Sequence, residues 1–167
     1  MNRSLAIYAV LFFGFFSSAC SSNKLSERDK FLQDQQQGID VKKGELSSVA
    51  GEYVGTLTSS DGSIHNVKLI LQVKDVPEAK GDADPVLIPK LLGSLRFIIG
   101  NEALGENIDC AIKSSEYVKA RNQISLVVFH AQFNELVISA TANGSQITGT
   151  WNATSVSRNG QIQVSRK

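Results

Sequence analysis

The side chains most often used as nucleophiles, general bases and zinc ligands are scarce in this chain of 167 residues. It has two cysteines, Cys20 and Cys110, and two histidines, His65 and His130. A zinc site needs three or four nitrogen, sulfur or carboxylate ligands at coordinated spacing, and neither histidine has a histidine or cysteine within five residues. We therefore predict no metal site. Apolar neighbours on both sides of Cys110 predict a buried and unreactive thiol.

Sequence motifs for catalysis and cofactor binding are missing too. The sequence contains no Gly-x-Ser-x-Gly element and neither of the standard glycine-rich phosphate loops. The acidic stretch 75–84 lacks the EF-hand spacing and its closing glutamate, so it is interpreted as a solvated loop. We therefore predict no catalytic residues and no cofactor, and we expect that the protein is not an enzyme.

The N-terminal segment has the order of an export signal. Arg3 precedes the apolar run 5–16, which is too short for a membrane helix because crossing the bilayer takes roughly 20 apolar residues. The small residues Ser17, Ser18 and Ala19 follow, and this order of charged, apolar and small residues is typical of a secretory signal. Residues 1–19 are therefore predicted to be a signal peptide.

The residues Phe16-Ser17-Ser18-Ala19-Cys20 resemble the lipobox of bacterial lipoprotein precursors. The resemblance implies that Cys20 receives a diacylglycerol on its thiol and becomes the acylated N-terminus that binds the lipid bilayer. Several acyl chains give stable anchoring, since each buried methylene contributes about 0.8 kcal/mol. Ser21 stands where an aspartate would retain a lipoprotein in the inner membrane. By resemblance, we expect the protein on the outer membrane facing the periplasm, with the cell surface as the alternative.

The remaining sequence is balanced in charge and begins with a polar segment. The whole chain has 17 Lys and Arg against 16 Asp and Glu. A nucleic-acid-binding domain needs a basic field to neutralise phosphates, so nucleic acid is excluded as a partner. Residues 20–48, rich in serine, glutamine and mixed charges, predict a tether. Within it, Ser26 could cap a short helix that stops at Gly38 and either floats or lies against the domain.

Residues 49–167 alternate apolar and polar side chains with a period of two, which predicts half-buried strands. Val67, Leu69, Leu71 and Val73, for example, share one face of a strand. The pattern predicts eight strands, at about 51–59, 64–74, 92–99, 107–113, 117–130 with a break near 121–122, 135–142, 145–154 and 160–166.

The turn residues favour an antiparallel arrangement. Asp61-Gly62, Asn143-Gly144 and Asn159-Gly160 are typical of tight hairpin turns. A run of antiparallel strands exposes its edges unless it closes. We therefore predict an all-β fold with a single up-and-down barrel of about eight strands, and a two-sheet β-sandwich is the alternative. Gly55 and Gly149, inside strands, fit places where a barrel wall bends or another backbone approaches.

This layout of a lipobox, a polar tether and a compact barrel resembles small bacterial lipoproteins with a lipocalin-like or calycin-like domain. Lipocalins carry a Gly-x-Trp element in the first strand, where this chain has Gly51-Glu52-Tyr53. Its tryptophan, Trp151, lies in the penultimate predicted strand. The resemblance therefore implies the fold, and a lipocalin ligand pocket does not follow from it.

An apolar stretch, "DPVLIPKLLG", follows the acidic segment. Prolines at 85 and 89 disfavour a central strand, so the region 75–92 is predicted to be a long loop. Long loops in compact domains are often functional. It could be a lid, a partner-contact site or a plug for one barrel end. The candidate ligand or partner contacts are Val86, Leu87, Ile88, Leu91 and Leu92.

The expected function is a structural or interaction module that docks an envelope protein, since a lipid anchor raises the effective concentration of partners at the membrane. The alternative is binding of a small apolar or amphipathic ligand, because an eight-strand barrel is just wide enough to hold either its own side chains or one small ligand. A second alternative is an enzyme without a recognisable motif.

Overall fold

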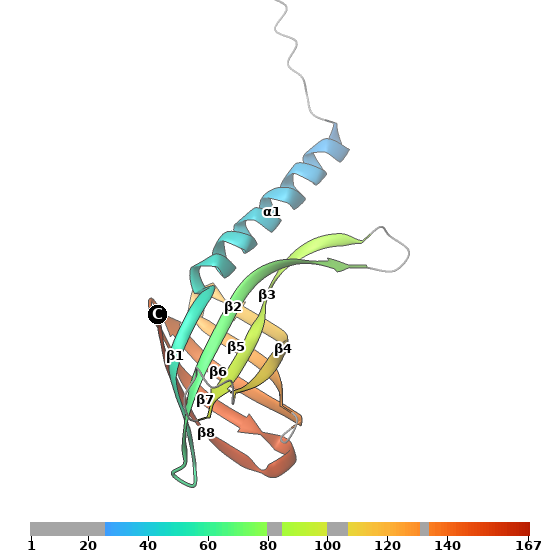
Figure 1. Ribbon diagram of the computed structural model, residues 1–167. Helices are drawn as coiled ribbons and strands as arrows, with labels where there is room; N and C mark the ends of the chain where they lie inside the picture. Colours follow the sequence, from blue (N-terminus) through green and yellow to red (C-terminus); the bar gives the residue numbers. More distant parts are fainter. Residues whose placement is uncertain (1–25, 80–84, 100–106, 131–133) are drawn as a thin grey trace, which may run out of the picture.

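The described part of the chain contains one long helix, eight strands and two short 3-10 helices, labelled η (Figure 1). The computed structural model describes residues 26–79, 85–99, 107–130 and 134–167, so the predicted signal peptide and Cys20 lie outside it. The elements are α1 Glu27–Val49, β1 Gly51–Ser59, β2 Ile64–Glu78, β3 Val86–Ile98, β4 Asn107–Val118, η2 Lys119–Arg121, β5 Gln123–His130, β6 Asn134–Asn143, β7 Gln146–Ala153, η3 Thr154–Val156 and β8 Arg158–Arg166.

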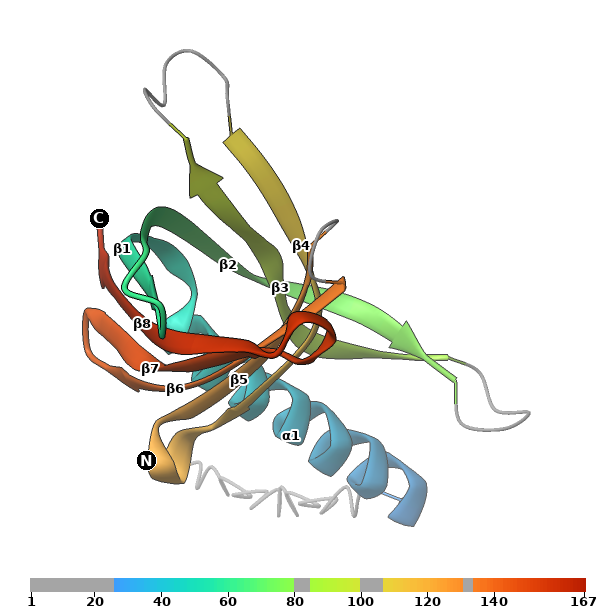
Figure 2. The same cartoon turned by 90° about the horizontal axis from the view of Figure 1, so that it is seen from below.

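The strands form one closed antiparallel barrel in which each strand pairs with its neighbours in the sequence (Figures 1 and 2). Closure occurs between the first and last strands: Gly55 of β1 lies opposite Val67 of β2 on one side and opposite Val164 of β8 on the other. The predicted up-and-down barrel is confirmed, and the β-sandwich alternative is wrong because a sandwich has no pairing between these two terminal strands.

Inward-facing side chains form one hydrophobic core inside the barrel. In β2, Val67 and Leu69 are fully buried, as the predicted alternation requires. Two of the buried polar aromatics, Tyr53 and Trp151, pair their polar atoms with backbone carbonyl oxygens. Trp151 Nε1 donates to the carbonyl oxygen of Thr58 at 3.3 Å, and Tyr53, on the first strand, is fully buried.

Helix α1 begins where the sequence predicts and ends later. The Ser26 hydroxyl oxygen accepts a hydrogen bond from the backbone N–H of Asp29 at 3.1 Å, which confirms the N-cap. The helix then continues through Gly38 and ends at Val49, so the predicted stop at this glycine is wrong. A glycine inside a helix costs about 1 kcal/mol. Burial of Leu46 and Val49 against the barrel offsets that cost.

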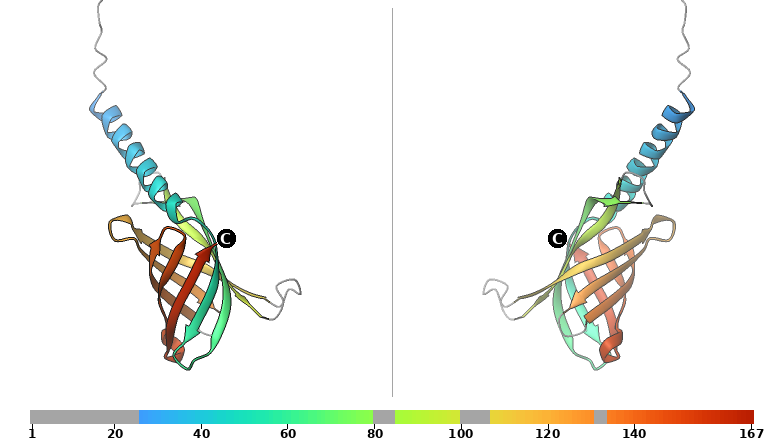
Figure 3. Two further views of the ribbon diagram at one scale, coloured as in Figure 1. Left: turned by 90° about the vertical axis from the view of Figure 1, so that its left-hand side faces the viewer. Right: turned by 90° about the vertical axis from the view of Figure 1, so that its right-hand side faces the viewer.

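Strands β2 and β3 continue past the barrel as a two-stranded arm, residues 72–78 and 86–92 (Figures 1 and 2). Figure 3 shows the barrel from two other sides, with α1 extending from the end at which β1 begins. Pairing between β1 and β2 stops at Leu71, and pairing between β3 and β4 starts at Ser94. The long loop predicted over this region is therefore wrong. Pro89 is accommodated within β3 because only one side of the strand is paired there, so its missing N–H removes no hydrogen bond from a second neighbour.

One of the three predicted hairpin turns is displaced. Asp61-Gly62 and Asn143-Gly144 lie at turns where the glycines have positive φ values of 85° and 59°. Asn159-Gly160 instead lies inside β8, because η3 and Ser157 make the connection from β7. Gly160 is required for close packing: a Cβ atom there would lie 1.9 Å from the carbonyl oxygen of Thr58.

Candidate functional site

The five predicted contact residues all lie on β3, and they do not form one surface. Leu91 is 1% exposed and belongs to the core, whereas Leu87 is 56% exposed on the arm. Val86, Ile88 and Leu92 lie on the opposite face of the strand, because side chains alternate along it. Leu91 is therefore a packing residue, and Leu87 is the most exposed apolar side chain of the five.

Beside the arm, β3 and β4 diverge, and α1 occupies part of the resulting split. The Lys42 ammonium donates to the carbonyl oxygen of Tyr117 at 3.4 Å, and the Ser115 hydroxyl donates to that of Leu91. Lys43 pairs with Asp75 on the arm at 2.9 Å. A groove of about 280 Å³ remains here, and its walls include three of the predicted contact residues together with three amines: Ile88, Leu91, Leu92, Lys42, Lys90 and Lys113.

The end of the barrel beside α1 is held closed by contacts among the helix, β1 and β8. The Tyr53 hydroxyl donates to the carbonyl oxygen of Val49 at 2.9 Å. Arg166 Nη2 donates to the Tyr53 hydroxyl at 2.9 Å and to the carbonyl oxygen of Ala50 at 2.9 Å. The same guanidinium lies 5.3 Å from the Tyr53 ring centroid. These contacts fix the helix over the barrel end, where Leu46 is buried.

The opposite end of the barrel carries an apolar pocket of about 280 Å³. This volume is just below the range of roughly 300–1,000 Å³ for typical ligand pockets, which often lie in barrel mouths. The His65 ring packs edge-on against Phe97, with 6.1 Å between centroids. Arg158 supplies a positive charge at the rim. The pocket is lined by Leu57, Ser59, His65, Phe97, Ile98, Ile99, Ile108, Leu136, Trp151 and Arg158.

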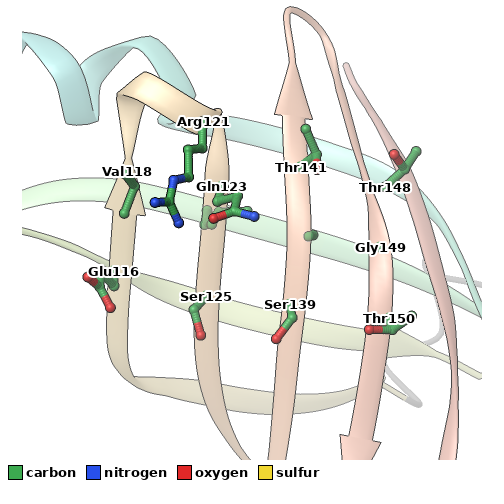
Figure 4. A pocket seen from close by; sticks show the side chains of 12 residues that line it. Glu116, Val118, Arg121, Gln123, Ser125, Ser139, Thr141, Thr148, Gly149 and Thr150 are labelled. Carbon is green, nitrogen blue, oxygen red and sulfur yellow. The ribbon is translucent and has the colours of Figure 1, made fainter.

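A polar groove lies on the outer wall over β4 to β7 (Figure 4), and sequence reasoning did not predict it. It encloses about 510 Å³. Arg121 leans over it from η2. Gly149 permits a close approach of the β6 backbone there, because a Cβ atom would lie 2.2 Å from the carbonyl oxygen of Ser139, and such an approach was one of the two roles predicted for this glycine. The register of the strands places the side chains of the groove in two rows. One row is Glu116, Ser125, Ser139 and Thr150, and the other is Val118, Gln123, Thr141 and Thr148.

Cys110 and the two histidines singled out in the sequence lie on three different strands. Cys110 is 2% exposed, and burial, with the nearby Asp109 carboxylate, raises the pKa of its thiol to about 11. The predicted burial is confirmed. His65 lies on β2 and His130 on β5, and the described part of the chain has no group of three or more potential metal ligands. Two hydrogen bonds from Arg96, at 2.7 and 3.0 Å, hold the pKa of Asp109 below its usual range.

Comparisons with known proteins assign no family to this chain. No family model matches the sequence, and no match was found among curated proteins or among solved structures. Across residues 26–79, 85–99, 107–130 and 134–167, no helix has the length and apolar character needed to span a bilayer.

Proposed function

We propose that this protein is a non-enzymatic docking module held on the envelope membrane by an acylated Cys20, on the outer membrane facing the periplasm. The observation that carries the proposal is the filled barrel interior. Leu69, Leu95, Leu126 and Ile138, on four different strands, are each 0% exposed within one core. An eight-strand barrel has room for its side chains or for one small ligand, and here side chains take that room. We therefore expect a partner to bind the outer surface of the barrel.

The length and position of α1 support this role. The 23-residue helix is about 34 Å long at 1.5 Å per residue. Its cap, Ser26, lies only six positions after Cys20. The anchored barrel would thus stand off the bilayer on a helical stalk in place of most of the flexible tether predicted for 20–48. A barrel held at a restricted distance meets membrane-associated partners at a raised effective concentration.

Binding of a small amphipathic ligand is the second candidate, and the pocket at the far barrel end favours it. Apolar walls there would hold a hydrocarbon segment, and Arg158 would face an anionic group at the rim. This site lies at the barrel mouth and does not require a hollow interior.

Native mass spectrometry of the full chain, released from membranes in detergent, separates the two candidates. Docking predicts only the masses of the protein and its acyl chains. A photo-crosslinking residue at Leu87 or Thr150 should then capture an envelope component in cells. A small molecule that survives purification, leaves on denaturation and is lost in Arg158→Ala but kept in the control Arg121→Ala would overturn docking in favour of ligand binding.

A further inference from the structure

Charged residues are unevenly distributed around the barrel. Residues 60–122 contain 17 Asp, Glu, Lys and Arg, whereas residues 123–166, which form β5 to β8, contain three: Glu135, Arg158 and Arg166. All five ion pairs between described residues include a side chain from β2, β3 or β4, on the charged part of the wall. The other part of the wall is uncharged over most of its surface.

The two rows of the outer groove continue beyond it around this uncharged wall. Thr150 lies opposite Gln161, which lies opposite Thr58, and Thr148 lies opposite Gln163, which lies opposite Thr56. The continuous rows cross five adjacent strands, β5, β6, β7, β8 and β1. We call the ten residues the neutral face: Gln123, Thr141, Thr148, Gln163 and Thr56 in one row, and Ser125, Ser139, Thr150, Gln161 and Thr58 in the other.

Every residue of the neutral face carries a hydroxyl or carboxamide group, and none is buried. Among the described residues, none of these ten side chains makes a hydrogen bond to another protein group. Adjacent strands lie about 4.8 Å apart, and successive outward residues along a strand lie roughly 6.6 Å apart. The face therefore presents a regular grid of donors and acceptors to whatever lies against it.

The composition of this grid restricts the class of partner. The ten residues carry no cation, and one guanidinium at the β4 end of the rows, that of Arg121, cannot neutralise a run of phosphates or acidic lipid head groups. The ten side chains themselves include no large apolar group, and the exposed apolar residues nearby, Val54, Val118 and Phe129, lie outside this set. The two rows therefore gain little from apolar burial, which is the main favourable term in most protein–protein association. Hydrogen bonds to an uncharged, hydroxyl-rich partner remain, and a grid that repeats along a line suits a partner that repeats as well.

We propose that the neutral face binds a linear, uncharged polysaccharide laid across β5, β6, β7, β8 and β1. Sugar hydroxyls donate to the Gln carbonyl and Ser or Thr oxygens and accept from the Gln amides. The groove at the β4 end of the rows holds one end of the bound segment beside Arg121. The inference rests on the proposed docking role and names the partner of that role.

The test is calorimetric titration of the full chain in detergent with three neutral hexasaccharides, built from β-linked N-acetylglucosamine, β-linked glucose and α-linked glucose. We expect at least one to bind with a Kd below a millimolar, and the Kd to change less than about twofold between about 50 and 500 mM salt, because neutral contacts are not screened. Ser139→Ala/Thr150→Ala should weaken binding about tenfold, from two neutral hydrogen bonds.

Matched controls separate binding from folding. Lys68→Ala/Lys74→Ala, on the charged wall, should leave the Kd unchanged. Thr150→Lys, which places a charge in the row without shortening the side chain, should also weaken binding, and circular dichroism should confirm that each variant is folded.

Three results would overturn the inference: no hexasaccharide binding at millimolar concentration, binding that survives both neutral-face variants, or self-association of the chain that these variants abolish, which would make a second copy the occupant. Capture of an envelope protein through a crosslinker at Leu87, with no saccharide binding, would sink this inference and leave the proposed docking role intact. If neither saccharide binding nor capture at Leu87 is observed, both this inference and the proposed docking role are refuted.

Discussion

Truncation of Leu46 to alanine tests whether α1 is part of the folded core. Leu46 is 3% exposed on the last turns of the helix, where it packs with the barrel. Replacing a buried leucine by alanine costs about 2–5 kcal/mol of unfolding free energy. Leu46 borders the groove between the arm and β4, so part of its surroundings can relax, and we expect about 2–3 kcal/mol.

The matched control is Leu32→Ala, on the same helix. Leu32 is 50% exposed and lies two heptads before the buried residue, so its truncation should change stability by no more than about 0.5 kcal/mol. Urea unfolding followed by fluorescence is the assay, since Trp151 is the single tryptophan and lies at the far end of the barrel. A loss reported there means that helix and barrel unfold as one unit.

Equal midpoints for the two variants, with unchanged denaturant dependence, would refute this reasoning. The helix would then be a tether that rests on the barrel without stabilising it.

Four further predictions use the same chain. Gly149→Ala should cost about 1–3 kcal/mol or more in the urea assay, because its Cβ atom overlaps backbone, and a wild-type midpoint would contradict the packing described. Arg166→Ala should lower the thermal unfolding midpoint more than Arg166→Lys, because the lysine keeps the positive charge and loses only the planar guanidinium beside the Tyr53 ring. Cys110 should resist iodoacetamide at neutral pH, because its thiol has a raised pKa of about 11 in the folded protein. This pKa exceeds the unfolded value, so the contribution of the thiol to folding stability is complete below about pH 8.5 and is lost as the pH rises toward 11. Asp109 has a lowered pKa, so its contribution to folding stability is present above its unfolded pKa of about 3.9 and is lost as the pH falls through the folded value. Asp109→Asn should therefore make the unfolding free energy fall less steeply at acidic pH.

The strands were predictable because each strand buries one face, which gives the sequence a period of two. Closure was predicted on a different ground, because a run of antiparallel strands that stays open exposes its edges. The helix end was not predictable from Gly38, since burial of Leu46 and Val49 outweighs the local cost of a glycine and depends on the folded barrel. Pro89 led to a wrong prediction of a loop for a similar reason. A proline is disfavoured in a strand that is paired on both sides, whereas β3 is paired on only one side within the arm.

The neutral face is partly visible in the sequence, because the scarcity of charge over 123–166 can be counted there directly. Its meaning depends on register, because only the pairing of β7 with β8 and of β8 with β1 brings Thr150, Gln161 and Thr58 into one line. Pairing across the closure joins residues about 100 positions apart, and no local pattern encodes such a contact.

The way α1 enters the barrel determines how the molecule would resist mechanical load. A pull on the N-terminal end of α1 would pass along the helix into β1, which pairs along its length with both β2 and β8. Tension along that strand strains both ladders of hydrogen bonds in shear, so many bonds share the force instead of opening one after another. Arg166 adds a clamp between the last strand and the backbone around Ala50, at the point where the force arrives. The topology would therefore suit the proposed role, in which an anchor at Cys20 holds the barrel at the membrane while a bound polymer is under drag.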